Sequence, residues 1–335
     1  MTKRARIIYN PTAGREILKQ KLVDIISVYE KAGYETSIFA TTPEHNSALN
    51  EARRVSEDGF DLVVAAGGDG TINEIINGIA PLDKRPELAI LPAGTTNDFA
   101  RALKIPRDDL VESAKVVLKK NVLKMDIGKT INENSVKYFM NIAAGGSMTK
   151  LTYDVPSDLK TIFGYLAYLV KGAELLPQLR PVKMHLKYDN DQYDGKASMF
   201  FVAMTNSIAG FEQIVPDAEL DDGKFTMIIV KTGNLVEILQ LITKVLNGGK
   251  HVNDPRIIYK KTNKLEVSSE GKPLQINIDG EYGGDAPMTF INLKQHLGIF
   301  SNLDNDKKKI NNGKNKEIEK VKEELAEKVN ELPEK

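Results

Sequence analysis

The chain has 335 residues, of which 46 are basic and 46 acidic, and 41% are hydrophobic. A formal net charge of zero argues against a protein held on nucleic acid mainly by phosphate contacts, and the length indicates two domains. Cysteine is absent, which excludes disulfides, thiolate nucleophiles and cysteine-based zinc sites and fits a reducing cytoplasm.

Two segments bear on membrane targeting, and neither predicts a membrane-spanning protein. The N-terminus, MTKRARIIYNP, is basic but lacks the apolar core of a secretory signal. The longest apolar-rich stretch, residues 162–170, is far shorter than the ~20 residues that a spanning helix needs. We therefore expect a cytoplasmic protein whose only membrane contact is peripheral.

The first third of the chain alternates short apolar runs with helical patterns. Strands are expected at residues 5–9, 36–40, 62–66 and 88–91, and helices at 17–32, 47–58, 71–79 and after the loop that ends near residue 98. Fully apolar strands that alternate with helices predict a parallel sheet covered on both faces.

After about residue 124 the pattern changes to strands with few helices between them. Strands are expected at residues 182–188, 198–204, 225–231, 264–267, 274–278 and 288–293, with helices at 158–176 and 235–246. This composition predicts an antiparallel sheet or sandwich. We therefore divide the chain into an α/β domain over 1–124, completed by part of 295–303, and a β-rich domain over 125–294.

The tail over residues 304–335 is more than half charged, with apolar residues at helical spacing near its end. A solvated helix or a disordered segment is the favoured interpretation, and a helix that couples to a partner is the alternative.

A glycine-rich turn with an aspartate at its centre follows the third predicted strand, in the stretch AAGGDGTINEIING over residues 65–78. The dinucleotide fingerprint fails because Asn73 stands where its last glycine belongs, and no Walker A string exists. A bare Asp69 carboxylate would repel phosphate, but Mg²⁺ accepts carboxylates and phosphate oxygens together. Asp69 is therefore a candidate metal anchor; alternatively, it caps the helix that follows.

Two further polar loops follow predicted strands of the same sheet. Residues 10–14 read NPTAG after the first strand, and residues 92–100 read PAGTTNDFA after the fourth. Ligands bind at the carboxyl ends of strands in open parallel sheets. One such loop is ordinary turn chemistry, but together with the glycine-rich turn they predict a ligand site at this edge.

These motifs resemble the nucleotide-binding motifs of the diacylglycerol kinase catalytic family, most of all its soluble prokaryotic members, over about residues 1–300. The family includes sphingosine and ceramide kinases and is related to NAD kinases and phosphofructokinases. The resemblance implies a Rossmann-like nucleotide-binding domain followed by a β-sandwich lipid-acceptor domain. It also implies ATP and Mg²⁺ as cofactors, diacylglycerol as the acceptor, phosphatidic acid as the product, and a homodimer.

The resemblance assigns a nucleotide site and a metal site. The residues that it places around ATP are Asn10, Pro11, Thr12, Ala13, Gly14, Thr41, Gly67, Gly68, Asp69, Gly70, Thr71, Ile72, Asn73 and Thr95. It implies a carboxylate–water–Mg²⁺ network that uses Asp69, Asp98 and Asp126. Without the family, Asp126 would be interpreted as an aspartate on a surface strand.

Two acidic segments of the second domain also gain a role from the resemblance. In the string IDGE, Asp279 is implied as the base that accepts the hydroxyl proton, with Glu281 as the alternative and Asp69 as a further catalytic group. By itself, Asp-Gly is a common hairpin turn. A structural Mg²⁺ is implied at the Asp222 side chain and the backbone carbonyls of Glu219 and Lys224, where the alternative is a solvated loop.

The helix expected over 158–176 and three lysines bear on the predicted lipid site. The apolar stripe of the helix expected over 158–176 is favoured as core packing, with a minority of its side chains in an acyl-chain groove. Lys150, Lys160 and Lys171 could contact anionic headgroups at the inner membrane face. The alternatives are another acceptor, namely a sphingoid base, undecaprenol or NAD, and a non-catalytic nucleotide- or lipid-sensing module. A nicotinamide oxidoreductase is disfavoured by the failed fingerprint.

Overall fold

The structure is a computed structural model, and it describes residues 2–13, 17–146, 181–207, 214–231, 234–271 and 273–303. Gly14, Lys150, the helix expected over 158–176 with Lys160 and Lys171, and the tail over 304–335 lie outside the described residues. Among the described helices, none combines the length and the hydropathy needed to cross a membrane.

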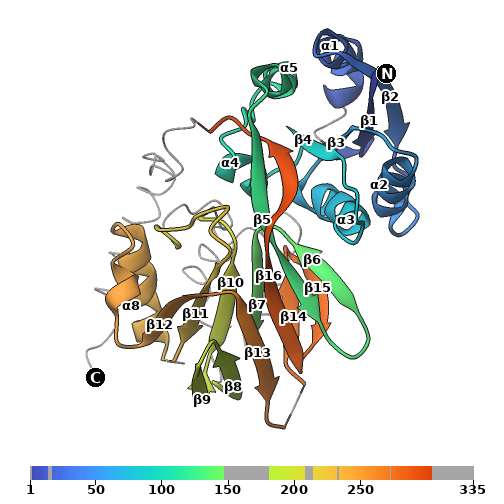
Figure 1. Cartoon of the computed structure of the whole chain (residues 1–335). Helices are drawn as coiled ribbons and strands as arrows, with labels where there is room; N and C mark the ends of the chain where they lie inside the picture. The colour runs from blue at the N-terminus through green and yellow to red at the C-terminus, as the bar shows by residue number, and fades with distance from the viewer. Residues whose placement is uncertain are drawn as a thin grey trace.

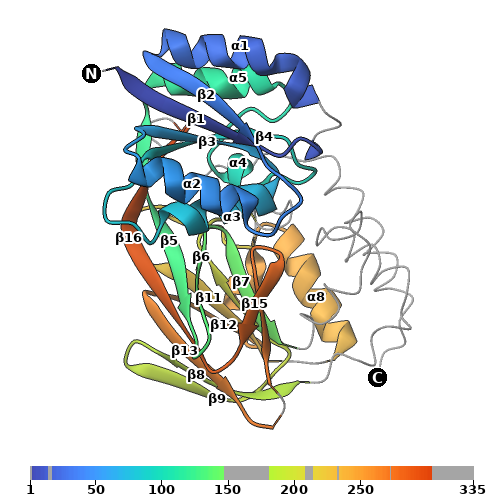
Figure 2. The same cartoon turned by 90° about the vertical axis from the view of Figure 1, so that its right-hand side faces the viewer.

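The N-terminal part is a parallel sheet between two layers of helices (Figure 1). Its strands are β1 (Lys3–Tyr9), β2 (Tyr34–Ala40), β3 (Leu62–Gly67) and β4 (Glu87–Pro92), in the order β2-β1-β3-β4. Its helices are α1 (Ile17–Lys31), α2 (Ser47–Glu57), α3 (Asp69–Ile79), α4 (Asp98–Ala102) and α5 (Leu110–Ala114), followed by the 3₁₀ helix η2 (Lys115–Lys119). Figure 2 shows α1 and α5 on one face and α2 and α3 on the other, so the predicted two-faced parallel sheet is confirmed.

The C-terminal part is formed by two antiparallel sheets around a second core. The first continues from β4 through β16 (Met288–Phe300), β13 (Lys264–Ser269), β8 (Val182–Tyr188) and β9 (Asp191–Ala197), and β5 (Val122–Ile131) pairs with β16 and β6 (Val136–Phe139). The second has the order β12 (Ile257–Thr262), β11 (Phe225–Val230), β10 (Met199–Ala203), β7 (Ile142–Gly146), β14 (Gln275–Ile278) and β15 (Glu281–Asp285). Helix α8 (Leu235–Leu246) and the 3₁₀ helix η5 (Lys250–Asn253) lie beside β12. The predicted β-sandwich is confirmed.

The second core lies between these two sheets and is aromatic at its centre. Phe290 from one sheet contacts Phe139 and Phe200 edge to face, with ring centroids 6.4 and 5.9 Å apart. All three rings are fully buried. Such edge-to-face contacts add to the hydrophobic gain of burial.

Strand β16 joins the two parts of the fold. Its C-terminal end lies parallel to β4, with Ile299 opposite Leu88, whereas its first half is antiparallel to β13. An irregularity between Leu293 and Leu297 separates these halves, and Gln295 there has a φ of 48°. The predicted boundaries of the two domains stay a prediction.

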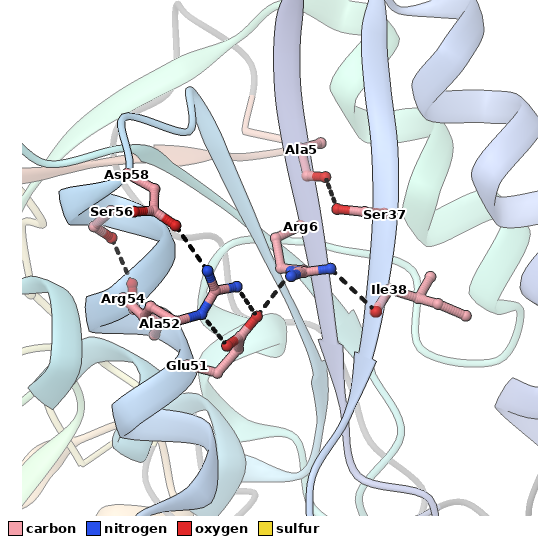
Figure 3. Close-up of polar contacts among 9 residues, drawn as sticks. All are labelled: Ala5, Arg6, Ser37, Ile38, Glu51, Ala52, Arg54, Ser56 and Asp58. Atoms are coloured by element: carbon pink, nitrogen blue, oxygen red, sulfur yellow. Dashed lines mark hydrogen bonds and ion pairs between the residues drawn. The ribbon is translucent and has the colours of Figure 1, made fainter.

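A buried carboxylate holds α2 on the parallel sheet (Figure 3). Glu51 is 6% exposed, and its two oxygens lie 2.8 Å from the Nε atoms of Arg6 and Arg54. Arg6 also donates to the Ile38 carbonyl of β2 at 3.2 Å. A buried carboxylate needs such partners because burial without them would cost several kcal/mol.

Helix α2 in turn fixes the position of α3, which begins at the glycine-rich turn. A Cβ added at Gly78 of α3 would lie 2.4 Å from the Leu49 carbonyl oxygen of α2, so only glycine permits this close approach. Glu74 of α3 accepts a hydrogen bond from the Ala48 N–H at the start of α2, at 3.1 Å. The helix that carries the predicted nucleotide residues is therefore rigidly placed.

Candidate functional site

The loops after the first four strands meet at one edge of the sheet. The Asn10 N–H donates to the Ala66 carbonyl at 3.0 Å, and the Ala93 N–H donates to the Gly67 carbonyl at 2.9 Å. The Thr41 N–H donates to the Tyr9 carbonyl at 2.9 Å. The structure therefore brings these loops together, as the sequence predicts.

In the first loop, the Asn10 side chain shapes the backbone. Its Oδ1 accepts from the Thr12 N–H at 3.0 Å and from the Thr12 hydroxyl at 2.8 Å. Asparagine commonly stabilises turns in this way. Asn10 and Thr12 therefore fix the conformation of this loop.

The glycine-rich turn and the fourth loop touch each other through glycines. A Cβ added at Gly94 would lie 2.6 Å from the Cα of Gly68, so a larger residue would separate the loops. The Asn97 side chain holds this arrangement, since it accepts from the Gly94 N–H at 2.9 Å and donates to the Gly94 carbonyl at 2.7 Å. Glycine permits the close backbone approach that phosphate-binding loops need.

The other predicted nucleotide residues differ in their accessibility. Gly70 and Thr95 are exposed, and Thr71 and Asn73 are half-buried. Ile72 is fully buried in the core of the first part, so its side chain cannot reach a ligand. Only the backbone of Ile72 is consistent with its predicted place in a nucleotide site.

Asp69 stands in the first turn of α3, but its carboxylate faces the next helix. It accepts from the Asp98 N–H at 3.3 Å and from the Phe99 N–H at 3.4 Å, both at the start of α4. Burial raises the pKa of Asp69, and these backbone hydrogen bonds oppose the rise. The alternative that Asp69 caps its own helix is therefore wrong: it caps α4, whose N-terminus also offsets its charge.

This contact changes the electrostatic argument for a metal. A divalent ion is not the only group that could make the Asp69 carboxylate tolerable beside a triphosphate, because the backbone amides of α4 already compensate part of its charge. Within the ranges that the structure describes, no group of three or more His, Cys, Asp or Glu side chains is arranged to hold a metal ion.

The other two predicted metal aspartates have partners in different places. Asp98 is buried, and its Oδ1 accepts from the Ser207 hydroxyl at 3.0 Å. Asp126 is 1% exposed and accepts from the Gly223 N–H at 2.6 Å and the Gln295 N–H at 2.7 Å. The interpretation of Asp126 as a surface-strand residue is wrong, because it ties the acidic turn to the irregular part of β16.

The acidic turn that contains Asp222 has a lysine beside it. Lys261 of β12 places its ammonium nitrogen 3.5 Å from Asp222, 3.6 Å from Glu219 and 3.9 Å from Asp217. The other Asp222 oxygen accepts from the Lys224 N–H at 2.8 Å. The oxygens suit a hard cation, but Mg²⁺ at Asp222 would compete with the Lys261 ammonium. No local sequence motif predicts this contact of Lys261, which lies on β12.

Asp279 is held at the junction of β14 and β15 by four hydrogen-bond donors. Its Oδ2 accepts from the Asn73 amide at 2.8 Å and the Met140 N–H at 2.9 Å, and its Oδ1 accepts from the Asn141 and Ile142 N–H groups at 3.1 and 2.9 Å. Burial raises its pKa to about 6, against the opposing effect of these donors. Its φ of 47° is uncommon for a residue other than glycine.

The contact between Asn73 and Asp279 brings two predicted site residues together. Asn73 belongs to the helix that follows the glycine-rich turn, and Asp279 follows it by 206 residues in the chain. Glu281, the alternative base, is exposed at the start of β15. A carboxylate that is ionised near neutral pH therefore lies directly beside the predicted nucleotide helix.

Comparison with known proteins agrees with this arrangement. A family model described as the diacylglycerol kinase catalytic domain matches residues 4–130, and one described as a YegS C-terminal NAD kinase beta sandwich-like domain matches residues 150–301. The chain is 50% identical over 297 residues to a diacylglycerol kinase of Bacillus subtilis (strain 168), covering 89% of this chain and 96% of the relative. It is 48% identical over 301 residues to a diacylglycerol kinase of Staphylococcus aureus (strain JH9), covering 90% of this chain and 93% of the relative.

A solved structure has the same fold. A crystal structure described as that of a diacylglycerol kinase from Bacillus anthracis str. Sterne superposes with a TM-score of 0.70 at 25% identity. The match covers 90% of this chain and 97% of the other.

Proposed function

The chain belongs to the diacylglycerol kinase family, and from that premise we propose that this kinase transfers the γ-phosphate of ATP to the hydroxyl of diacylglycerol, with Mg²⁺, to give phosphatidic acid. The family membership rests on relatives about 50% identical over nearly the whole of their length. The acceptor is inferred from the names of those relatives.

The observation that carries the proposal is the Asp279 carboxylate beside Asn73. An attacking alcohol must lose its proton, and a carboxylate placed next to it as a general base contributes on the order of 10²–10⁴ in rate. With its pKa raised to about 6, Asp279 is mostly ionised at neutral pH and still basic enough to accept the proton. We therefore assign the base to Asp279 in preference to the exposed Glu281.

The nucleotide would lie over the converging loops. The backbone N–H groups of the glycine-rich turn and the start of α3 suit phosphate oxygens, because the N-terminus of a helix carries positive potential. Phosphoryl transfer depends mainly on positioning and on neutralising charge. The predicted residues from Asn10 to Ala13, Thr41, Gly67 to Asn73 and Thr95 supply this positioning.

Mg²⁺, when bound with ATP, would neutralise charge that develops on the phosphate oxygens. Asp69 and Asp98 are the residues that would hold it, through water, since Mg²⁺ takes one or two carboxylates and keeps several waters. Asp126 has a different partner, because its carboxylate accepts a hydrogen bond from the Gly223 N–H of the acidic turn. A second, structural Mg²⁺ at Asp222 stays a proposal.

Access to diacylglycerol requires the protein to reach the membrane. We propose a cytoplasmic protein that contacts the inner membrane face peripherally and works as a homodimer. The membrane contact follows from the chemistry of a water-insoluble acceptor, and the dimer rests only on the resemblance to the family.

The test is phosphate transfer from γ-labelled ATP to a panel of acceptors in mixed micelles: diacylglycerol, a sphingoid base, undecaprenol and NAD. We expect labelled phosphatidic acid, and loss of the product when EDTA removes divalent metal. Faster labelling of another acceptor would redirect the proposal within the fold. Absence of labelling of every acceptor, with ATP still bound, would favour a non-catalytic sensing module.

A further inference from the structure

We infer that Asn77 is a positioning residue that orients the amide of Asn73 toward the Asp279 carboxylate. The inference rests on the proposed role of Asp279 as the base. It concerns a chain of hydrogen bonds that links the strand β6, the helix α3 and the base.

The backbone of Tyr138 in β6 fixes the orientation of the Asn77 side chain. The Tyr138 N–H donates to the Asn77 Oδ1 at 2.8 Å, and the Asn77 Nδ2 donates to the Tyr138 carbonyl at 2.9 Å. A backbone N–H can only donate and a carbonyl can only accept. The two Asn77 side-chain atoms therefore cannot exchange places without losing both hydrogen bonds.

The orientation of Asn77 then determines that of Asn73, one helical turn earlier on the same face of α3. The Asn77 Nδ2 lies 3.1 Å from the Asn73 Oδ1 and 2.9 Å from the Asn73 carbonyl oxygen. The two hydrogens of the Asn77 Nδ2 are shared among these two oxygens and the Tyr138 carbonyl oxygen, and a donor at this position favours the Asn73 Oδ1 over the Asn73 Nδ2 as its neighbour. The Asn73 Nδ2 is consequently directed away, at 2.8 Å from the Asp279 Oδ2.

The orientation of Asn73 matters because, among the described residues, it is the one side chain that donates to Asp279. The other three donors are backbone N–H groups of residues 140–142. All four donors are neutral. If the Asn73 amide turned over, its oxygen would face the carboxylate and would disfavour the ionised form that a base needs. Asn77 therefore acts on the base through Asn73, without touching it.

Asn77→Asp and Asn77→Ala test this inference. The carboxylate introduced by Asn77→Asp would keep the acceptor for the Tyr138 N–H, but it has no donor and would attract the Asn73 Nδ2 away from Asp279. We expect kcat of Asn77→Asp to fall by about tenfold or more, with the KM for ATP within about twofold of the wild-type value. The kcat of Asn77→Ala should fall by less, because this substitution only removes the contact with Asn73.

The titration of Asp279 provides a readout that does not depend on the lipid substrate. In ¹³C NMR of the carboxyl groups, with the resonance assigned by Asp279→Asn, we expect Asn77→Asp to raise the midpoint by about one pH unit. In an Asn73→Ala background, the neutral substitution Asn77→Ala should add little further shift, because its route to Asp279 is gone. Any shift that Asn77→Asp still causes in that background measures the direct repulsion between the two carboxylates.

His296→Gln is the matched control for a loosened helix. His296 bonds to the Ala80 carbonyl at the end of α3 at 2.8 Å and stacks on Tyr138, so it also joins α3 to β6. It should leave the Asp279 midpoint unchanged. An equal midpoint in wild type and Asn77→Asp would overturn the inference, whereas failure of wild type to form phosphatidic acid would overturn the proposed function alone.

Discussion

Asp254 and Asp279 are carboxylates with several hydrogen bonds in two regions of the C-terminal part, and their pKa values move in opposite directions. Asp254 lies between η5 and β12, where Arg256 and Lys244 donate to it at 2.8 and 2.6 Å. The hydrogen bond from the Arg256 guanidinium is the largest cause that lowers the pKa of Asp254. At Asp279 burial dominates, and the pKa rises to about 6.

The difference lies in the charge of the donors. Cations beside Asp254 lock it in the ionised form and secure the loop before β12. Four neutral donors hold Asp279 in place equally well, but they leave it able to gain and lose a proton near neutral pH. The carboxylate that we propose as the base and a carboxylate of the scaffold therefore differ in the charge of their donors and in the direction in which the pKa moves.

The largest expected effect is the loss of turnover on replacing Asp279 by asparagine, which the same replacement at Asp254 should not cause. Asp279→Asn should lower turnover by on the order of 10²-fold or more, because the base is lost, and should leave ATP affinity close to wild type. Asp254→Asn should retain turnover per folded molecule. Rates measured with ATP binding on the same samples would check this, and comparable losses in both variants would erase the distinction.

The second prediction concerns stability against pH. Asp254, with its folded pKa lowered, contributes stability above its unfolded pKa of about 4, and this is lost as the pH falls. Asp254→Asn should cost about 2 kcal/mol at pH 7, between the values for exposed and buried ion pairs. Urea unfolding at several pH values would measure it, and its cost should shrink below about pH 4.

The contribution of Asp279 to folding stability should depend on pH in the opposite direction. With its folded pKa raised, its contribution is present below about pH 4 and is lost as the pH rises through about 6. Wild type should therefore lose about 3 kcal/mol relative to Asp279→Asn over that window. Parallel unfolding curves for wild type and variant across this window would contradict the raised pKa.

Gly94 and Gly78 allow a similar comparison between the candidate site and the rest of the fold. A Cβ at Gly94 would meet Gly68 at 2.6 Å, between the nucleotide loops, and one at Gly78 would meet Leu49 at 2.4 Å, between α2 and α3. Gly94→Ala should raise the KM for ATP about tenfold, because a misplaced loop loses phosphate contacts. Gly78→Ala should cost about 1–3 kcal/mol in unfolding free energy, as overpacking does. Reversal of these two outcomes would show that the loops are not the nucleotide site.

The partners of Asp222 combine the two kinds found at Asp254 and Asp279: a neutral donor in the Lys224 N–H and a cation in Lys261. Lys261→Gln removes an ammonium 3.5 Å from the carboxylate, so Mg²⁺ should stabilise the variant at lower concentration, by a few-fold. Thermal unfolding against Mg²⁺ concentration measures this, with Lys264→Gln as the control. No change in the Mg²⁺ response would argue against a cation at this turn.

The first part of the fold was predictable because its central strands, β3 and β4, are buried on both faces. In β3, for example, all six residues are buried, which gives an uninterrupted apolar run. Helix α8 was also predicted with its observed bounds. Two of the missed strands have weak signals: β7 reads IAAGG, and β9 reads DQYDGKA and lies at the edge of its sheet. Strand β12 was also missed, although it reads IIYKKT and begins with β-branched residues.

The candidate site was predictable in its loops but not in its connections. The carboxyl ends of parallel strands meet at one edge, so local motifs were sufficient there. The contact of Asn77 with Tyr138 spans 61 residues, and Lys261 reaches an acidic turn on another strand connection. Neither has a local pattern, because tertiary packing alone brings these side chains together.

The most direct test of Asp279 as the base is the pH dependence of kcat/KM for diacylglycerol at saturating Mg-ATP, between about pH 5 and 8. Since the base must be ionised, we expect the rate to fall with decreasing pH through a single ionisation near the Asp279 pKa of about 6. A constant kcat/KM across this range, in protein that stays folded, would contradict the assignment.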